Sequence, residues 1–282
     1  MIKRVAAYWA LTKPGITWLV LLTTSVGFWM AADAVVFPLF AHTLVGAGLV
    51  VAGTNALNEW WERDADARMH RTRRRPLPAG ALSPEAALVF AITISVVGLS
   101  WLAVLTNAST TLLAALSLAL YVLAYTPLKR RTSWALFVGA VPGALPILGG
   151  WTAGGGDLSW AGLVLFAILF LWQIPHFLAL GWLYREDYQR GGFAMLSRDD
   201  QDGHATGRQA IVFAAALLIV SLLPTFLGLA GPRYLGGAVV LGAVLVGYSA
   251  ALLRAPTPVT ARRLFGASVV YLPILLLLLL IR

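Results

Sequence analysis

Long apolar stretches recur along the entire sequence, and they limit more than any other feature what the chain can fold into. A helix needs roughly 20 apolar residues to cross the hydrocarbon core of a bilayer. Stretches of this kind lie approximately at 16–32, 38–57, 84–106, 110–126, 133–151, 159–182, 210–230, 235–253 and 265–281. Only 12% of the 282 residues are charged, too few to cover a water-soluble protein of this size. We therefore predict an all-α polytopic bundle of about nine transmembrane helices, forming a single domain over residues 1–282.

The basic residues predict how this bundle lies in the membrane. Of the 21 lysines and arginines, only Arg233 and Arg282 fall on the side opposite to the N-terminus. Cytoplasmic loops carry such an excess, so we expect a cytoplasmic N-terminus, two long cytoplasmic loops near 59–83 and 183–209, and an outside C-terminus. A short interfacial helix is expected at 2–12. The net charge of +9 then reports topology, and nucleic acid is not an expected partner, because its binding needs a soluble basic face.

The first long loop begins with a row of hard oxygen ligands. If the helix of the second span continues through it, Asn58, Glu62 and Asp66 share one face, because residues four apart are neighbours on a helix. Glu59 has Arg63 four residues further on, an ordinary favourable pair, whereas Glu62 faces a like charge. Mg²⁺ suits such a row best, because it favours one or two carboxylates together with substrate phosphates. A solvated, mixed-charge helix end is the alternative interpretation.

Arginines follow these acids directly, at Arg71, Arg73, Arg74 and Arg75. One loop thus offers metal ligands together with donors for phosphate groups. The same run is also an inside-positive signal, and its outermost members need have no further role. The sequence has no cysteine, so a metal would have to bind oxygen or imidazole. Two acidic loops at one face favour a site at the cytoplasmic mouth of the bundle.

This pattern resembles the first signature of the UbiA superfamily of intramembrane prenyltransferases, and within it the heme O synthase (protoheme IX farnesyltransferase) branch. The signature is Asn58-x3-Glu62-x-Asp64-x-Asp66 with Met69, Arg71-Thr72 and Arg75-Pro76-Leu77. Further segments agree in order, from about residue 8 to 200: Leu11-Thr12-Lys13-Pro14, Tyr125-Thr126-x2-Lys129-Arg130-Arg131-Thr132, Gly149-Gly150-Trp151, Trp172-Gln173-Ile174-Pro175-His176-Phe177 and Tyr184-Arg185-Glu186-Asp187-Tyr188.

Some positions depart from the family's pattern. Glu62 stands where the family usually has Asp, which keeps the charge with a longer reach. The branch often has Arg at the position of Gly15 and Asn at that of Ala135, and many members continue a second motif as Asp-x3-Asp, where this chain has Asp187 and then Gly191. These departures concern the detail of substrate contacts more than the class of reaction.

The resemblance implies a cytoplasm-facing active-site cavity in which Mg²⁺ bridges the diphosphate of farnesyl diphosphate. It implies catalytic and metal-binding roles for Asn58, Glu62, Asp66 and Asp187, with Glu186 as a further ligand. It implies diphosphate contacts for Lys13, Arg71, Arg75, Tyr125, Lys129 and Arg185. A vinyl group of heme B would accept the farnesyl group, giving heme O and diphosphate in heme biosynthesis for terminal oxidases. The expected location is the inner membrane of a bacterium, with the lipid bilayer as a partner; a heme A synthase or an oxidase would be the candidate protein partner.

Several assignments stay open from the sequence. His176 lies within a span, where a histidine is either buried and hydrogen-bonded or part of a substrate site, here for heme, whose iron imidazole commonly binds. The later Asp199, Asp200 and Asp202 are expected to be solvated loop charges. An aromatic acid or a quinone precursor is the alternative acceptor. A transporter that only binds diphosphate or metal is the alternative class of protein, and the cytoplasmic position of the acids speaks against it.

Overall fold

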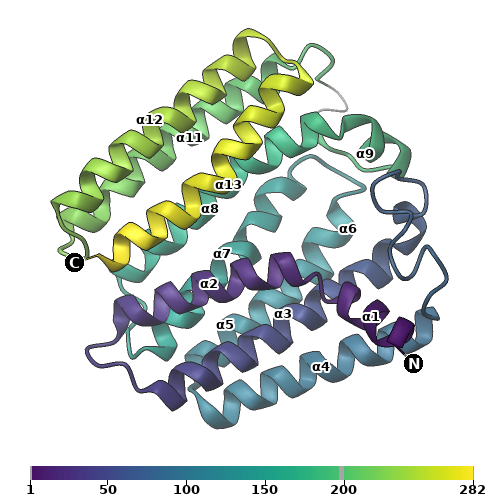
Figure 1. The fold of residues 1–282 in the computed structure, drawn as a ribbon, viewed down its shortest axis with the longest axis horizontal. Helices are drawn as coiled ribbons and strands as arrows, with labels where there is room; N and C mark the ends of the chain where they lie inside the picture. The colour runs from purple at the N-terminus through teal and green to yellow at the C-terminus, as the bar shows by residue number, and fades with distance from the viewer. Residues whose placement is uncertain (1, 197–199, 282) are drawn as a thin grey trace. The chain divides into compact units, whose positions relative to one another are not determined.

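The computed structural model describes residues 2–196 and 200–281, and every regular element in these ranges is a helix (Figure 1). Asp199 lies outside them. In chain order the elements are α1 (Ile2–Leu11), α2 (Pro14–Ala31), α3 (Phe37–Asp66), α4 (Pro84–Leu105), α5 (Ala108–Ala119), the π-helix η1 (Leu120–Tyr125), α6 (Thr126–Leu128), α7 (Ala135–Ala153), α8 (Trp160–Leu183), α9 (Arg185–Gly191), α11 (His204–Phe226), α12 (Pro232–Arg254) and α13 (Pro258–Leu280).

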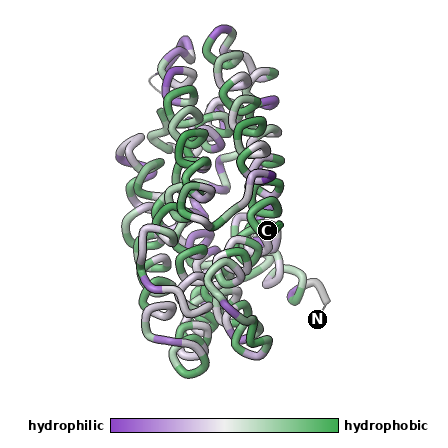
Figure 2. Tube along the Cα trace, turned by 90° about the vertical axis from the view of Figure 1, so that its left-hand side faces the viewer, coloured by the Kyte–Doolittle hydropathy of each residue, from purple (hydrophilic) through white to green (hydrophobic). Residues whose placement is uncertain are grey.

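Nine segments of the described chain are helical, long and apolar enough to cross a membrane, and they confirm the predicted spans. One of them, Ala108–Leu128, joins α5, η1 and α6. Figure 2 shows apolar residues along most of the length of the long helices. The last three segments begin earlier than predicted, at His204, Pro232 and Pro258, because a polar first turn precedes the apolar stretch of each.

Local sequence explains where several helices begin. Pro14, Pro84, Pro232 and Pro258 occupy first turns, where the fixed φ of proline suits a helix and its missing N–H needs no partner. Side-chain caps add to this: the Ser83 hydroxyl, for example, accepts a hydrogen bond from the Ala86 N–H at 3.2 Å. Within α3, no proline or glycine interrupts the polar end after Gly53, so the helix runs on to Asp66 as predicted.

Contacts group the chain into two compact units. The first comprises the chain up to Asp157 together with Glu186–Phe193, and the second comprises Leu158–Arg185 and the described residues from Ala194 onward. In the first unit α3 packs on α4, and α7 packs on α2 and α5. In the second unit α8 and α12 each pack on α11 and α13. The single domain predicted for residues 1–282 stays a prediction.

Asp200 departs from its expected role as a solvated loop charge. Its side chain is buried and accepts hydrogen bonds from the backbone N–H groups of Ala205 at 3.1 Å and Thr206 at 2.7 Å. The Thr206 hydroxyl donates to it as well, at 2.6 Å. Burial raises the pKa of Asp200, but these hydrogen bonds outweigh burial and hold the pKa below its usual value. Asp200 therefore satisfies the free donors at the start of α11.

Glycines let α2 and α7 approach backbone to backbone. A Cβ on Gly27 would overlap the carbonyl oxygen of Ile147, and a Cβ on Gly150 would overlap that of Thr24. Helices in lipid gain little from the hydrophobic effect between them, so close contact of this kind is a main source of their packing energy. The neighbouring Gly149 has no atom within 4 Å of its would-be Cβ.

We predict that Gly150→Ala lowers the thermal stability of the protein in detergent, whereas Gly149→Ala does not. The methyl group at position 150 must push α2 and α7 apart, and overpacking of this kind costs about 1–3 kcal/mol. The methyl group at position 149 enters open space, and removing a glycine from a helix contributes about 0.5–1 kcal/mol of stability. Thermal denaturation of the two variants measures the difference. Equal stabilities would show that the α2–α7 contact is loose.

Candidate active site at the end of the third helix

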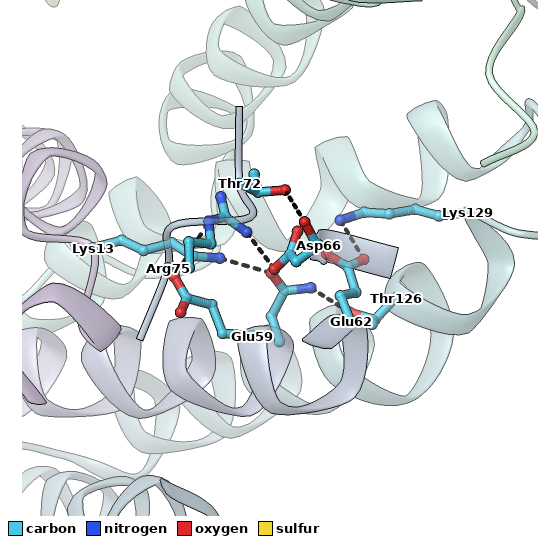
Figure 3. Close-up of polar contacts among 9 residues, drawn as sticks. Lys13, Glu59, Glu62, Asp66, Thr72, Arg75, Thr126 and Lys129 are labelled. Atoms are coloured by element: carbon cyan, nitrogen blue, oxygen red, sulfur yellow. Dashed lines mark hydrogen bonds and ion pairs between the residues drawn. The ribbon is translucent and has the colours of Figure 1, made fainter. Parts of the chain in front are cut away.

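The polar end of α3 forms, with three cations from elsewhere in the first unit, a buried group that we call the polar cluster (Figure 3). Each of its four α3 residues is at most 4% exposed. One helix face carries them because Asn58, Glu62 and Asp66 follow one another at four residues and Glu59 precedes Glu62 by three. The members of the polar cluster are Asn58, Glu59, Glu62 and Asp66 from α3, and Lys13, Arg75 and Lys129 from connecting segments.

Lys13 reaches the polar cluster from the turn between α1 and α2. Its φ is +48°, the only positive value of a non-glycine residue in the described chain, and such a conformation costs of order 1–3 kcal/mol. The Nζ donates to Asn58 Oδ1 at 2.7 Å, while Asn58 Nδ2 donates to Thr126 Oγ1 at 3.2 Å. These two bonds orient the Asn58 amide. Burial, aided by repulsion from Arg75, lowers the pKa of Lys13 to about 8.

Arg75 binds two carboxylates at once. Its Nη1 donates to Asp66 Oδ2 at 2.8 Å, and its Nε lies 3.6 Å from Glu59 Oε1. Burial disfavours the charged guanidinium, but Asp66 and Glu59 outweigh burial and raise the pKa of Arg75. The loop before it is held by Thr72, whose hydroxyl donates to the backbone oxygen of Asp66 at 3.0 Å. The arginine is thus fixed to the helix that precedes its loop.

Lys129 neutralises the remaining carboxylate. Its Nζ donates to Glu62 Oε1 at 2.9 Å and lies 4.3 Å from the centre of the Tyr125 ring. Burial would lower the pKa of Lys129, but Glu62 and the neighbouring tyrosines hold it well above its usual value. The lysine follows the π-helix η1, a rare element that is often found at functional sites. Tyr121 and Tyr125 stack edge to face in it, with ring centres 5.0 Å apart.

Two carboxylate oxygens of the polar cluster have no hydrogen-bond partner among the described residues. They are Glu59 Oε2 and Asp66 Oδ1, and both are buried. A buried oxygen without a partner is costly, so such atoms suit a cation. Hard carboxylate and amide oxygens are ligands that Mg²⁺ accepts. In the described chain, however, no group of three His, Cys, Asp or Glu side chains is arranged as a metal site.

Asp187 lies on α9 against the loop that follows α3. Its carboxylate accepts hydrogen bonds from the backbone N–H groups of His70 at 3.0 Å and Arg71 at 3.2 Å, and from Arg190 Nη2 at 2.6 Å. Burial raises the pKa of Asp187, but the hydrogen bond from Arg190 and those from the backbone outweigh burial and lower the pKa. Neighbouring Glu186 points outward, with a side chain that is 77% exposed and 3.9 Å from Arg190.

His176 belongs to the second unit, where the hydrogen bonds of Ser268 indicate which ring nitrogen of His176 carries the proton. Its Nδ1 lies 2.8 Å from the Ser268 hydroxyl, and that hydroxyl donates its one hydrogen to the Phe265 carbonyl at 2.6 Å. Nδ1 must therefore be the donor to Ser268, which leaves Nε2 with its lone pair. Trp172 stacks on the ring at 4.9 Å, and Phe265 lies at 4.8 Å. With Nδ1 as the donor, Nε2 is the nitrogen that could bind a metal, which makes His176 a candidate ligand.

The structure thus unites only part of the predicted site. The polar cluster brings together six of the predicted residues, with Tyr125 beside them: Asn58, Glu62, Asp66, Lys13, Arg75 and Lys129. Arg71 and Asp187 meet through the Arg71 backbone. Arg185 lies over the Trp182 ring at 4.6 Å, in the second unit.

Glu59 is the residue of the polar cluster that the sequence interpretation missed. The expected pair with Arg63 is wrong: Glu59 turns inward to Arg75, while Arg63 lies 3.9 Å from Asp64 and over the Trp60 ring. The signal was available, because position 59 precedes Glu62 by three residues and so lies on the same helix face.

Comparison with known proteins identifies the class of protein. The fold is that of a multi-pass membrane protein with a buried ionic site, and the sequence model of the UbiA prenyltransferase family matches residues 20–277. The chain belongs to the UbiA prenyltransferase family.

Named relatives refine the comparison. The protoheme IX farnesyltransferase of Solibacter usitatus is 44% identical over 282 residues, covering 95% of each chain. That of Sorangium cellulosum is 49% identical over 236 residues, covering 83% of this chain and 84% of the relative.

Solved structures agree in fold. Digeranylgeranylglyceryl phosphate synthase superposes with a TM-score of 0.82 at 19% identity, covering 100% of this chain and 98% of the other. A UbiA homolog from Archaeoglobus fulgidus bound to GPP and Mg²⁺ gives a TM-score of 0.68 at 16% identity, covering 95% and 97%. Family membership sets aside the alternative of a transporter that performs no chemistry.

We predict that Glu59→Gln lowers kcat/KM for prenyl transfer by roughly tenfold, a loss of about 1.4 kcal/mol in transition-state stabilisation. The change removes one of the two carboxylates that hold Arg75 and leaves the polar cluster with an excess positive charge. Steady-state kinetics measures the effect. Asp64→Asn is the matched control, because Asp64 lies on the same helix with a side chain that is 77% exposed. Equal kcat/KM values in the two variants would show that the Glu59 carboxylate does not contribute to catalysis.

Proposed function

We propose that this chain transfers the farnesyl group of farnesyl diphosphate to a vinyl group of heme B. The C–O bond to diphosphate breaks as the new C–C bond forms, and water then adds to the remaining vinyl carbon with loss of a proton, giving heme O and diphosphate. The observation that carries the proposal is the polar cluster, in which three cations converge on a row of buried acids. Such an arrangement suits the binding and activation of a diphosphate. The likeness to the two bacterial protoheme IX farnesyltransferases supports heme as the acceptor.

The cations of the polar cluster provide the diphosphate contacts. Lys13, Arg75 and Lys129 present N–H groups from three separate segments, which can surround an anion from different directions. Arg71 adds a further donor from the same loop as Arg75, and the diphosphate contact that the sequence predicts for Arg185 stays a prediction. Negative charge develops on the leaving diphosphate when the allylic C–O bond breaks, and fixed positive charges stabilise that state. The Tyr125 ring stabilises the charge of Lys129 through a cation–π contact.

The acids of the polar cluster provide the metal contacts, and we propose Mg²⁺ as the metal. Asn58, Glu62 and Asp66 would hold it, together with the unpartnered oxygen of Glu59. Mg²⁺ supplies charge that stabilises the departing diphosphate. The sequence also predicted Asp187 and Glu186 as metal ligands; for Glu186 this stays a prediction, and for Asp187, whose oxygens accept hydrogen bonds from the 70–71 backbone and Arg190, we propose a different role. No side chain needs to form a covalent bond with the farnesyl group, because the acceptor attacks it directly.

His176 is proposed as a contact for the heme. Ser268 fixes the ring through Nδ1, and Nε2 would then be the nitrogen that meets the iron. Histidine nitrogen commonly binds heme iron, and the aromatic rings of Trp172 and Phe265 around it suit a flat, apolar macrocycle. The residue would then orient the acceptor and take no part in bond breaking.

The membrane placement is part of the same proposal. The charge distribution favours a bacterial inner membrane with the N-terminus and the polar cluster at the cytoplasmic side and the C-terminus outside. Substrates of this kind fit such a location, because farnesyl diphosphate combines a long apolar chain with a charged head. A heme A synthase or an oxidase is proposed as the protein partner that receives the product.

The first test is an assay of purified protein in detergent with heme B, farnesyl diphosphate and Mg²⁺, with products identified by mass. We expect heme O to appear, to be lost on chelation of Mg²⁺, and to be absent with Asp66→Ala, because that variant loses the carboxylate that holds Arg75. Retained membrane insertion and an unchanged thermal transition are the controls for that variant. Consumption of farnesyl diphosphate only with an aromatic acid or quinone precursor would overturn heme as the acceptor.

A second test concerns the acceptor alone. We expect His176→Ala to weaken binding of heme B by at least about tenfold, while farnesyl diphosphate binding stays within about twofold, because an axial nitrogen is lost and the polar cluster is untouched. Titration followed by heme absorption measures the first quantity. His204→Ala, at an exposed histidine, is the matched control. An unchanged heme spectrum and affinity in His176→Ala would place the heme elsewhere.

A further inference from the structure

Asp187 uses both carboxylate oxygens to hold the loop that carries Arg75. Oδ1 accepts from the His70 backbone N–H at 3.0 Å and from Arg190 at 2.6 Å, and Oδ2 accepts from the Arg71 backbone N–H at 3.2 Å. Hydrogen bonds from a charged acceptor to backbone donors are among the stronger ones in proteins. Two successive peptide groups of the loop are therefore fixed to α9 by one side chain.

Other contacts hold the end of α9 against the loop that follows α3. Arg68 Nη2 donates to the Gly191 carbonyl at 3.2 Å. A Cβ on Gly191 would lie 3.0 Å from Met69 Sδ and 2.9 Å from the Phe193 ring. Both of those side chains are buried, so an acid at position 191 would have to displace them. Position 191, where an Asp-x3-Asp motif would have its second acid, thus holds a glycine that lets α9 pack closely against Met69 of the loop.

The loop leads from this anchor directly into the polar cluster. One residue after Arg71, the Thr72 hydroxyl donates to the Asp66 carbonyl at 3.0 Å, and the Arg75 N–H donates to the Thr72 carbonyl at 2.9 Å. The Arg75 guanidinium then meets Asp66 and Glu59. Each step is short, so a shift of the 70–71 backbone would move the segment that carries Arg75 toward Asp66 and Glu59.

We propose that Asp187 is a positioning residue for the diphosphate site: it clamps the backbone at residues 70–71 and thereby places Arg75, and it is not a metal ligand. This inference rests on the proposed function, because it assigns Arg75 to a diphosphate.

Asp187→Asn tests the proposal, because the amide keeps the size of the side chain but places an NH₂ group against N–H donors. We expect hydrogen exchange of the His70 and Arg71 amides to accelerate at least about tenfold, and KM for farnesyl diphosphate to rise about tenfold with kcat changed less than about threefold. The Mg²⁺ concentration for half-maximal activity should stay unchanged. Gln189→Ala, an exposed change on the same helix, is the control for all four readouts.

Asp187→Glu is a second variant, and it keeps the carboxylate. Compared with Asp187→Asn, it should show slower exchange of the His70 and Arg71 amides and a lower KM for farnesyl diphosphate. Unchanged exchange at residues 70–71 in Asp187→Asn would overturn the clamp, and a large increase in the Mg²⁺ requirement would make Asp187 a metal ligand. Hydrogen exchange needs no substrate, so it tests the clamp even if the wild-type protein fails to farnesylate heme.

Discussion

Burying the acids at the end of α3 is the constraint on which the first unit depends. Moving a carboxylate out of water costs several kcal/mol unless a partner charge and hydrogen bonds replace the solvent. Glu59, Glu62 and Asp66 are nearly inaccessible, so each needs a cation close by. No cation on α3 meets this need, because Arg63 faces outward over Trp60. The cations must therefore come from other segments, and their positions are set by the acids.

Two of the three segments that supply these charges take unusual backbone conformations. The chain enters the left-handed region at Lys13, and it widens into a π-helix before Lys129. After α3 it turns back through Thr72 so that Arg75 reaches Asp66. Local strain of this kind persists only where the surroundings compensate for it, and it clusters at functional sites. Here the compensation is the contact at the end of each segment, a hydrogen bond from Lys13 to the Asn58 amide and ion pairs from Lys129 and Arg75.

Rigid helix packing provides the frame in which these contacts can be precise. α2 begins one residue after Lys13 and is locked to α7 by the backbone contacts of Gly27 and Gly150. α7 also makes room for the Tyr125 ring at Gly139, where a Cβ would overlap it. The lysine that follows that ring therefore depends on a glycine in a different helix. In this way packing deep in the apolar part of the unit fixes the side chains that would meet the substrate.

The sequence by itself determined the features that depend on neighbouring residues. Apolar length gave the nine spans, residue spacing placed Asn58, Glu62 and Asp66 on one helix face, and family signatures supplied the class of chemistry. The tertiary structure decided which charge meets which. Glu59 pairs with Arg75 and not with Arg63, and Asp200 serves the start of α11 instead of solvent.

The physical reason is that helix formation is local, whereas an ion pair between Lys129 and Glu62 joins residues 67 positions apart. Spacing along a helix says which side chains share a face, but several cations in this chain could have reached that face. Asp187 illustrates the limit most clearly, because its partners are backbone N–H groups, which every sequence offers at almost every position. Only the path of the folded chain selects the two that it binds.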